Sequence, residues 1–554
     1  RLTDTTDATV YSQKPSTSTT MPGNSESPEN ISTNMPNNRM FQVSAPVQTR
    51  IDTYTKSLKP LPVYKTKQLD EQIVKFIVKG FHAFCIVEED EFKNIFKLIL
   101  PSYSIPTRKT ISNSLIPKFY QTTKEKVLLQ LSSAEAVCLT TDGWTSMNNV
   151  SFISLTAHFI DEKTQLQSVL LGCTEFHERK TKENLLNFLQ TEVLKWGLCN
   201  KITAVITDNA ANILAAVRST TWRHFSCFAH DINLDELEKV KAIVQYFKHS
   251  SYADHKLKAM QAQLELPLLK LKQSVVTRWN STYDMLERIL KIKDAVVSTL
   301  AIEQPKLNTL SPEDWKMLEE TCNILKVFYE ITTEISSEQI VSISKPIIFV
   351  RLMKNHVLKS LTNMNSARCQ SLLEKLRQQL NERFKDIESN VLTSEASFLD
   401  PRFKKHAFSN REQYEVCLRM IKTKLRNLIS HEQIQPQQPV QAQQTTKSSI
   451  WAEFDRQVEE DLIKNPTAAS IVELDKYLGE PLLQRCDDPL KWWHERKLLY
   501  PNLYTLMKRR LCITATSVPS ERIFSKAGLT ISTRRSSLKP NKASQVLFLN
   551  HNLK

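Results

Sequence analysis

Glycine-rich nucleotide loops are absent from this chain, which has only 7 glycines among 554 residues. Neither GxxxxGK[ST] nor GxGxxG occurs, so the common phosphate-binding turns are excluded and no nucleotide cofactor is expected. The G-x-S-x-G elbow of serine hydrolases is missing too. There is no run of eighteen apolar residues and no secretory signal pattern, so we expect no membrane span. Because the chain begins with Arg1 rather than Met, we expect its natural N-terminus to lie upstream.

Closely spaced cysteines are also lacking. No two of the 10 cysteines lie within five residues of each other, which excludes a CxxC zinc finger. Their scatter among apolar neighbours is typical of reduced, buried thiols in an intracellular protein.

Basic side chains outnumber acidic ones. The 74 Lys and Arg residues and 59 Asp and Glu residues give a net charge of +15. Such a balance favours a polyanionic partner, with nucleic acid first, although many basic soluble proteins bind none.

The composition changes along the chain divide it into several regions. Residues 1–60 are rich in Ser, Thr, Pro and Asn and have few large apolar side chains, so we expect this tail to be disordered. The remaining regions are a helical N-terminal module (61–132), the first part of a core of strands and helices (133–236), a helical insertion (237–430), a Gln/Pro-rich linker (431–449) and a C-terminal region (450–554).

Residues 133–236 change from helical to strand-like periodicity. Three strands with short connections predict an antiparallel meander, and they are followed by helix, strand, short helix and strand. The expected ranges are 136–140, 150–160, 166–176, 182–198, 202–207, 213–217 and 224–229. This βββαβαβ order is that of a ribonuclease-H-like fold, which predicts an α+β protein whose core is interrupted by a large helical insertion.

Three acidic residues stand in distinctive motifs. Asp142 in CLTTDGWTS and Asp208 in AVITDNAAN lie at or just past strand-like runs, and Glu521 in SVPSERIFSKAG opens a short helix. Carboxylates so placed are suited to Mg²⁺ or Mn²⁺ in a two-metal phosphoryl-transfer site, where we expect them to converge within about 4–7 Å. Taken singly, each of the three acidic residues also has an ordinary structural explanation: a turn or helix-cap residue for the two aspartates, and a first-turn helix residue for the glutamate. Gly528 is expected to end the helix of Glu521.

A family resemblance rests on motifs that follow one another from about residue 69 to 554. They are TTDGWTS, VITDNAAN, CFAH, TRWNST, FLDPRFK, DPLKWW and CITATSVPSERIFSKAG. The chain resembles the hAT superfamily of DNA transposases and the BED zinc-finger proteins derived from them. The resemblance implies that Asp142, Asp208 and Glu521 are a catalytic, metal-binding triad. It also implies that the C-terminal region dimerises and completes the catalytic core, and that the protein is nuclear.

Each of two further residue pairs in the motifs has two possible roles. Cys227 and His230 form a CxxH pair, but two ligands do not close a tetrahedral zinc site, so a structural or site-supporting role is favoured. The resemblance implies that Trp279 stacks on a flipped base with Arg278 near a phosphate; equally, Trp279 is a core anchor.

Basic residues bracket Glu521 on both sides. They are predicted to form a track for DNA phosphates, although charge runs are usually solvated faces. These residues are Lys508, Arg509, Arg510, Arg534, Arg535 and Lys539.

Several other residues of the motifs are expected to be structural. Asp400 and Arg402 are predicted to form an internal ion pair, and Trp492 and Trp493 to fill the C-terminal core. Other apolar residues of this region are compatible with either core or dimer interface. They are Leu474, Tyr477, Leu478, Leu490, Leu498, Leu499, Leu503, Leu547, Phe548 and Leu549.

The sequence favours a metal-dependent nuclease and strand transferase that acts in DNA recombination on DNA ends, as a homodimer or larger homo-oligomer. The alternative is a domesticated nuclear DNA-binding regulator that cuts nothing, and a helical scaffold that binds only proteins is a weaker third reading. All three acidic residues are present, which favours the enzyme. The Cys and His ligands of a BED finger do not occur in this chain, so we expect that the finger either lies upstream of Arg1 or has been lost. Sequence-specific DNA reading by such a finger is not expected from these residues.

Overall fold

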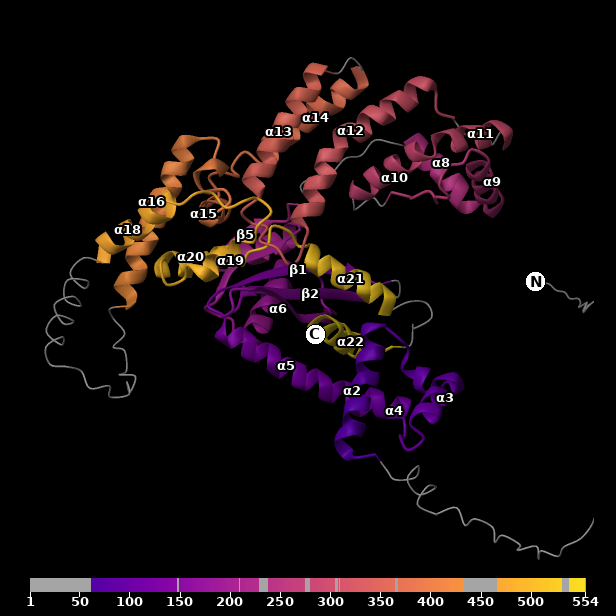
Figure 1. Cartoon of the computed structure of the whole chain (residues 1–554), viewed down its shortest axis with the longest axis horizontal. Helices are drawn as coiled ribbons and strands as arrows, with labels where there is room; N and C mark the ends of the chain where they lie inside the picture. Colours follow the sequence, from indigo (N-terminus) through magenta and orange to yellow (C-terminus); the bar gives the residue numbers. More distant parts are fainter. Residues whose placement is uncertain are drawn as a thin grey trace, which may run out of the picture. The chain divides into compact units, whose positions relative to one another are not determined.

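In a computed structural model, the protein has one mixed β-sheet, against which several of its helices pack (Figure 1). Its strand order is β3-β2-β1-β4-β5. β1 is antiparallel to β2 and β2 to β3, whereas β4 is parallel to both β1 and β5. The elements are β1 (Val137–Thr145), β2 (Ser151–Ile160), β3 (Leu166–Glu175), α6 (Lys182–Lys195), β4 (Ile202–Thr207), α7 (Ala211–Arg218) and β5 (His224–Ser226). The predicted α+β class and the predicted order of these elements are confirmed.

The structure describes residues 61–146, 149–208, 210–228, 238–274, 279–303, 307, 309–363, 367–432, 466–530 and 538–553. The expected disordered tail and almost all of the Gln/Pro-rich linker lie outside these residues. None of the described helices is both long and apolar enough to cross a membrane.

Strand β1 is longer than the sequence predicted, since it continues to Thr145 rather than ending near Thr140. The pairing of β1 with β4 stops at Thr140 and Ile206, but its pairing with β2 continues to Thr145 and Ser151. Asp142 therefore lies inside a strand, just beyond the point at which β4 has ended.

Helices cover both faces of the sheet (Figure 1). On one face α5 (Ile116–Ser133), α6 and α7 pack on buried β-sheet residues such as Leu139 and Val205. On the other, α21 (Val518–Thr530) and α22 (Pro540–Asn552) pack on Phe152 and Leu170. Burial of such side chains stabilises the fold by about 1.5–3 kcal/mol each. Segments more than three hundred residues apart in the sequence therefore share one core.

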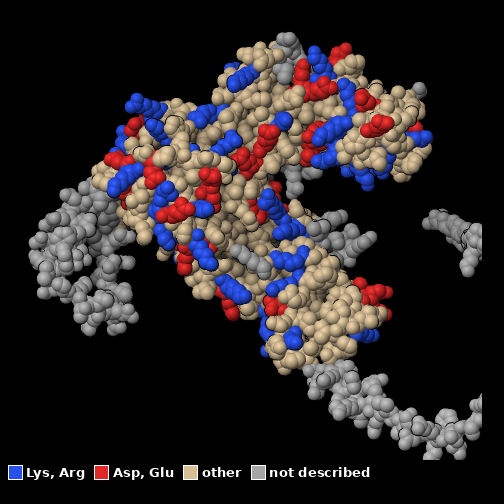
Figure 2. Space-filling model, viewed as in Figure 1, with Lys and Arg blue, Asp and Glu red and all other residues tan. Residues whose placement is uncertain are grey.

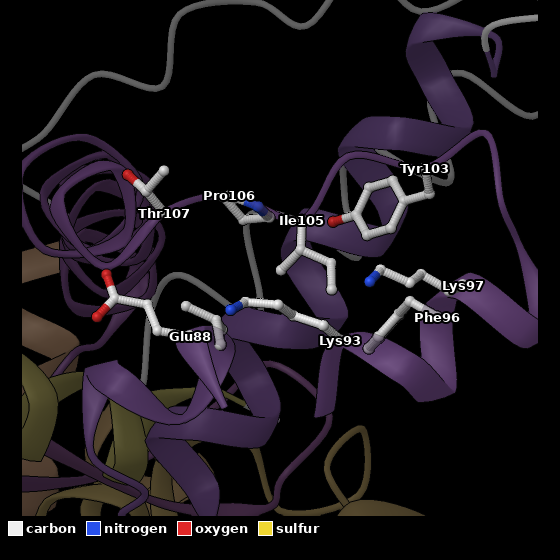
Figure 3. A pocket seen from close by; sticks show the side chains of 9 residues that line it. Glu88, Lys93, Phe96, Lys97, Tyr103, Ile105, Pro106 and Thr107 are labelled. Atoms are coloured by element: carbon white, nitrogen blue, oxygen red, sulfur yellow. The ribbon is translucent and has the colours of Figure 1, made fainter. Parts of the chain in front are cut away.

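The N-terminal helices form a small core together with Leu549 of α22. They are α2 (Val63–Lys79), α3 (Asp90–Ile99) and α4 (Arg108–Thr110), with a 3₁₀ turn at Phe84–Glu88 and a π turn at Ile111–Leu115. A pocket of about 250 Å³ opens beside α3 and is lined by Lys93, Phe96 and Tyr103, among others (Figure 3). The Tyr103 hydroxyl donates to Asp70 Oδ1 at 2.7 Å, which fixes one wall of this pocket.

The regions after the sheet that the sequence predicts to be helical are helical in the structure. Proline at the first turn starts several of these helices, because a missing N–H costs nothing there, and Ser311 and Asp314 form a capping box. The helices are α8 (Glu238–His249), α9 (Ser251–Gln263), α10 (Trp279–Lys291), α11 (Lys293–Glu303), α12 (Pro312–Ile335), α13 (Pro346–Asn363), α14 (Ala367–Arg383), α15 (Val391–Leu399), a 3₁₀ turn (Lys404–Ala407), α16 (Arg411–Glu432), α18 (Pro466–Gly479), α19 (Pro489–Glu495) and α20 (Pro501–Leu511).

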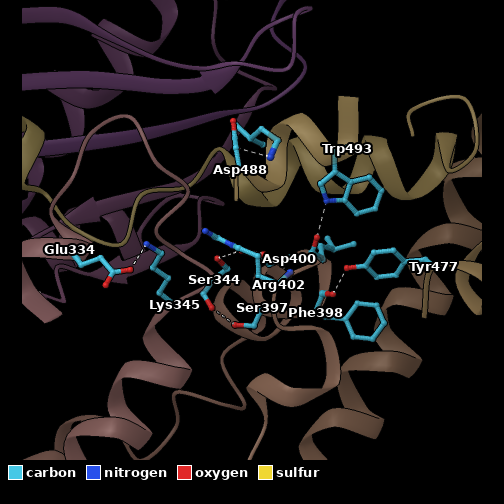
Figure 4. A network of polar contacts seen from close by, with 12 residues as sticks. Glu334, Ser344, Lys345, Ser397, Phe398, Asp400, Arg402, Tyr477, Asp488 and Trp493 are labelled. Carbon is cyan, nitrogen blue, oxygen red and sulfur yellow. Dashed lines mark hydrogen bonds and ion pairs between the residues drawn. The ribbon is translucent and has the colours of Figure 1, made fainter. Parts of the chain in front are cut away.

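The internal ion pair predicted from the FLDPRFK motif is confirmed (Figure 4). Arg402 Nη2 lies 2.7 Å from Asp400 Oδ2, and their side chains are 6% and 0% exposed. Ser344 donates to the same carboxylate oxygen at 2.6 Å. Nearby, Trp493 Nε1 donates to the Leu399 carbonyl at 2.9 Å, so this core tryptophan also holds the end of α15.

The structure distinguishes buried from exposed residues among the C-terminal apolar residues, which the sequence left as either core or dimer interface. Most are intramolecular core: Leu474, Tyr477, Leu490, Leu503, Leu547, Phe548 and Leu549 are buried, and Leu478 packs partly buried against them. Leu498 and Leu499 differ, being 90% and 50% exposed. Only this last pair among them offers substantial apolar surface.

Gly528 does not end its helix, contrary to the prediction. Helix α21 continues through it to Thr530, and a Cβ atom at this position would meet nothing within 4 Å. Glycine inside a helix costs about 1 kcal/mol relative to alanine, so packing of Ile523, Phe524 and Ala527 against the sheet outweighs the local preference.

Buried His158 makes the stability of the fold depend on pH. Its Nε2 lies 3.1 Å from Thr156 Oγ1, and burial, with a smaller effect of His551, lowers its pKa from 6.5 to about 3. The neutral imidazole therefore stabilises the native state above pH 6.5, and this contribution is lost as the pH falls from 6.5 toward 3, by about 1.4 kcal/mol per unit.

We expect His158→Gln to reduce the loss of stability between about pH 7.5 and pH 5. Urea denaturation of both proteins at each pH measures the difference. His177→Gln, at a side chain 79% exposed, is the matched control and should follow the wild type. An equal acid loss in all three proteins would contradict the assignment.

Candidate functional site

Asp142 and Asp208 come together in one pocket of about 250 Å³. The last residue pair of the parallel β1–β4 register is Thr140 with Ile206, so continuing the register by two residues brings Asp142 opposite Asp208. Since the carboxyl ends of parallel strands meet at one edge of a sheet, the two acidic residues are neighbours despite their separation in sequence.

Local backbone hydrogen bonds orient both carboxylates. Gly143 N–H donates to Asp142 Oδ1 at 2.7 Å, and Ala210 N–H donates to Asp208 Oδ1 at 3.3 Å. The second bond lies just before α7, so the turn that follows β4 also sets the direction of the Asp208 side chain.

Helix α21 brings Glu521 next to β1. Ser520 Oγ lies 2.8 Å from Thr140 Oγ1, two residues before Asp142, and both side chains are fully buried. Trp144 stacks on Phe524 with ring centroids 5.9 Å apart. These two contacts fix the first turn of α21 against the strand that carries Asp142, and Glu521 itself is half-buried there.

The three carboxylates do not form a ready-made ligand cluster. Glu521 is not among the residues that line the pocket of the two aspartates. Over the whole described part of the chain, no three Asp, Glu, His or Cys side chains are grouped to hold a metal ion. The expected convergence of the triad therefore stays a prediction, whereas the pairing of Asp142 with Asp208 is a feature of the structure.

The donor set suits a hard divalent cation. Asp142 and Asp208, which carry carboxylate oxygens, both line one pocket, and none of the other described residues that line it is Cys or His. Mg²⁺ and Mn²⁺ take oxygen ligands and are commonly bound by one or two carboxylates together with substrate phosphates. The residues therefore fit such an ion at the aspartate pair.

Cys227 joins the end of β4 to the segment before α21. Its N–H donates to the Thr207 carbonyl at 2.9 Å, and its buried sulfur accepts the N–H of Ser517 at 3.2 Å. These two bonds are compatible with the site-supporting role favoured from the sequence, which stays a prediction. His230 lies outside the described residues, so the pair itself stays a prediction.

A neutral histidine supports the same strand end. The Thr207 hydroxyl donates to the Asp208 carbonyl at 2.7 Å, so His224 Nε2, at 2.9 Å, acts as the donor to Thr207. Burial, followed by the nearby Arg218 charge, lowers the pKa of His224 to about 4. Nothing in the sequence marked this residue.

Sequence reasoning also missed Lys180, which lines the aspartate pocket. It follows β3 and lies far from either acidic motif in the sequence. No spacing rule would have found it, because its position depends on how the β3–α6 turn folds back over β1.

The structure gives the exposure and ion pairs of several residues of the predicted basic track, and DNA binding by the exposed ones stays a prediction. The prediction that Arg510 contacts DNA is wrong. Its side chain is buried, and its Nε lies 2.6 Å from Glu395 Oε2, so it faces the core. Lys508 is 15% exposed and pairs with Glu135 at 2.6 Å. Arg509 is exposed.

The other predicted DNA contacts stay predictions. Arg278, Arg534 and Arg535 lie outside the described residues, as does the side chain of Trp279, whose backbone begins α10. On the face seen in Figure 2, basic and acidic side chains are interspersed over the described surface.

Three family models match separate parts of the chain. The hAT family C-terminal dimerisation region matches residues 473–553. The ZBED1 RNase-like domain matches residues 140–224, and the ZBED1 RNase-like helical domain matches residues 229–324. The first match includes α21 and α22, and the second includes both aspartates.

Curated relatives cover most of this chain. A putative AC transposase of Zea mays is 27% identical over 83% of this chain and 62% of its own length. Zinc finger BED domain-containing protein 4 of Homo sapiens is 24% identical over 91% of this chain and 45% of its own. The putative transcriptional regulator tpeD of Talaromyces stipitatus is 24% identical over 88% and 62%.

This chain thus spans only about half to three fifths of the length of these relatives. The resemblance inferred from the motifs is nevertheless confirmed, by matches over residues 140–224, 229–324 and 473–553. The hAT dimerisation region, the two ZBED1 RNase-like domains and the transposase and BED-type relatives together identify the chain as one related to the hAT transposases.

Proposed function

We propose that this protein is a hAT-type transposase that cleaves DNA and joins DNA strands in a reaction dependent on Mg²⁺ or Mn²⁺. The observation that carries the proposal is the shared pocket of Asp142 and Asp208, at the ends of paired parallel strands. The strand order and the return of α21 to β1 support a ribonuclease-H-like core interrupted by the intervening helices.

In this proposal Asp142, Asp208 and Glu521 hold the metal ions. Gly143 N–H and Ala210 N–H keep the two aspartates oriented, and Ser520 and Trp144 keep the helix of Glu521 beside them. Bound metal would activate the attacking oxygen and stabilise charge that develops on the phosphoryl group. Of the predicted basic residues that the structure describes, Arg509, Lys508 and the exposed Lys539 are left to assist at the edge of the DNA.

We also propose self-association through the C-terminal region and action in the nucleus, where the DNA substrate is. The match to a dimerisation region supports the former. Since most apolar residues of this region are intramolecular core, exposed Leu498 is the best candidate contact.

Leu498→Asp is expected to raise the dissociation constant of the homo-oligomer at least about tenfold, because a charge would enter an apolar contact. Sedimentation of the full chain measures this constant. Leu129→Asp, at a side chain 73% exposed on α5, is the matched control and should associate like the wild type. Equal dissociation constants for all three proteins would exclude Leu498 from the interface.

The cleavage reaction itself tests the proposed function. Wild type and the variants Asp142→Ala, Asp208→Ala and Glu521→Ala are incubated with the terminal DNA of the element, with Mg²⁺, with Mn²⁺ and with EDTA. We expect metal-dependent nicking and joining by wild type alone. Cleavage that survives all three changes would refute the assignment. Wild type that binds DNA and self-associates but never cuts would support a domesticated regulator.

A further inference from the structure

The Lys180 side chain shares the pocket of the two aspartates but has no part in the metal chemistry proposed above. A Cβ atom on Gly143 would lie 3.0 Å from Lys180 Nζ, so the ammonium group is directly above the backbone that follows Asp142. Glycine at position 143 leaves the space that this amine occupies. The side chain is half-buried, and the structure gives its ammonium no hydrogen bond or ion pair to any described residue.

The backbone around Lys180 is held in place from two helices. Asn212 of α7 donates through Nδ2 to the Lys180 carbonyl at 2.8 Å. Asn184 of α6 donates to the Arg179 carbonyl at 2.9 Å, and the same carbonyl accepts the Thr181 N–H at 2.7 Å. Because the turn is fixed, Lys180 loses little additional backbone freedom when it binds a ligand.

Two more features of the pocket favour an anion on this side. Thr141 lines it, is only 1% exposed, and its Oγ1 has no hydrogen-bond partner among the described residues. Helix α7 begins at the pocket after Ala210, with no side-chain cap. Its first N–H groups and positive dipole end are therefore available to an acceptor.

The charges of the pocket determine when an anion binds there. Asp142 and Asp208 carry two negative charges against the one positive charge of Lys180, so a phosphate would be repelled from the pocket as it stands. A divalent cation on the aspartates reverses this balance. Anion binding at Lys180 should consequently require the cation.

We propose that Lys180 contacts a phosphate oxygen of DNA bound at the aspartate pocket, once a divalent cation neutralises Asp142 and Asp208. This inference rests on the proposed function. The simpler alternative is that Lys180 only offsets the charge of the two aspartates. That role would affect stability but not the way in which DNA affinity depends on salt and cation.

The test compares DNA binding by wild type, Lys180→Met, Lys180→Arg and Lys163→Met. Lys163 is an exposed lysine in the β2–β3 turn at the opposite end of the sheet, so it controls for the loss of one positive charge. Anisotropy of a labelled duplex of about 30 base pairs is measured from about 50 to 200 mM KCl. Ca²⁺, as a cation that does not support cleavage, is compared with EDTA.

In Ca²⁺ we expect Lys180→Met to bind several-fold more weakly, with a salt slope smaller by about one. Lys180→Arg should retain most of the affinity, and in EDTA the Lys180→Met effect should largely vanish. The proposal is overturned if Lys180→Met matches Lys163→Met in Ca²⁺, or if its defect is the same in EDTA. Wild-type protein that binds DNA but never cleaves it would refute the proposed function. The comparison of DNA binding by Lys180→Met and Lys163→Met would still decide whether Lys180 contacts a phosphate.

Discussion

Replacing Glu395 by alanine is expected to lower the free energy of unfolding by about 3–5 kcal/mol. The Glu395 side chain is only 1% exposed and pairs with Arg510, from Nε at 2.6 Å, and with Lys424. Its loss would leave two largely buried cations without a partner charge. Burial, together with the nearby Arg510 charge, already lowers the pKa of Lys424, which is the direction expected where a cation is poorly solvated.

Urea denaturation of the full chain measures this effect. Glu374→Ala is the matched control, since its ion pair with Arg377 is about half exposed and should contribute less than about 1 kcal/mol. Glu395 lies on α15 and Arg510 on α20, so a large effect would also show that these distant helices unfold together. Similar losses in the two variants would mean that the buried pair contributes no more than a surface one.

Asp208→Asn is expected to reduce metal-dependent cleavage by roughly a thousandfold or more. A metal ligand supplies several kcal/mol of transition-state stabilisation, and about 1.4 kcal/mol corresponds to tenfold in rate. Asparagine keeps the shape of the side chain and an oxygen that can still accept the Ala210 N–H, so the turn after β4 should stay folded. The variant therefore separates charge from structure.

Single-turnover cleavage rates in Mg²⁺, at equal DNA occupancy, measure the loss. Asp475→Asn, at an exposed position of α18, removes the same charge elsewhere and should cleave at the wild-type rate. A similar rate for Asp208→Asn would show that this carboxylate does not bind the catalytic metal.

The sheet and the aspartate pair were predictable because they depend on local patterns. The β-branched run before Asp208 and the alternation of residues 151–160 indicate strands directly, and parallel pairing then brings the strand ends together. The length of β1 was not predictable, because its last residues, including Trp144, are held by pairing with β2 and not by their own apolar pattern.

Burial explains the remaining differences between sequence and structure. Arg510 belongs to a basic run that looks solvated, yet Glu395 more than a hundred residues earlier places it in the core. Leu498 and Leu503 are both leucines of the C-terminal region, but Leu498 is 90% exposed and Leu503 is 0% exposed. Lys180 joins the site only through the fold of one turn. Tertiary contacts of this kind leave no mark in a local pattern.

Direct binding of Mn²⁺ tests the central claim, that Asp142 and Asp208 form a metal site with Glu521 beside it. Electron paramagnetic resonance of Mn²⁺ titrated into the full chain gives the affinity without any need for DNA. The account predicts that Asp142→Asn and Asp208→Asn each weaken Mn²⁺ binding by on the order of tenfold or more, with a loss also for Glu521→Gln and none for Asp475→Asn. Unchanged Mn²⁺ binding in an Asp142→Asn/Asp208→Asn double variant would contradict it.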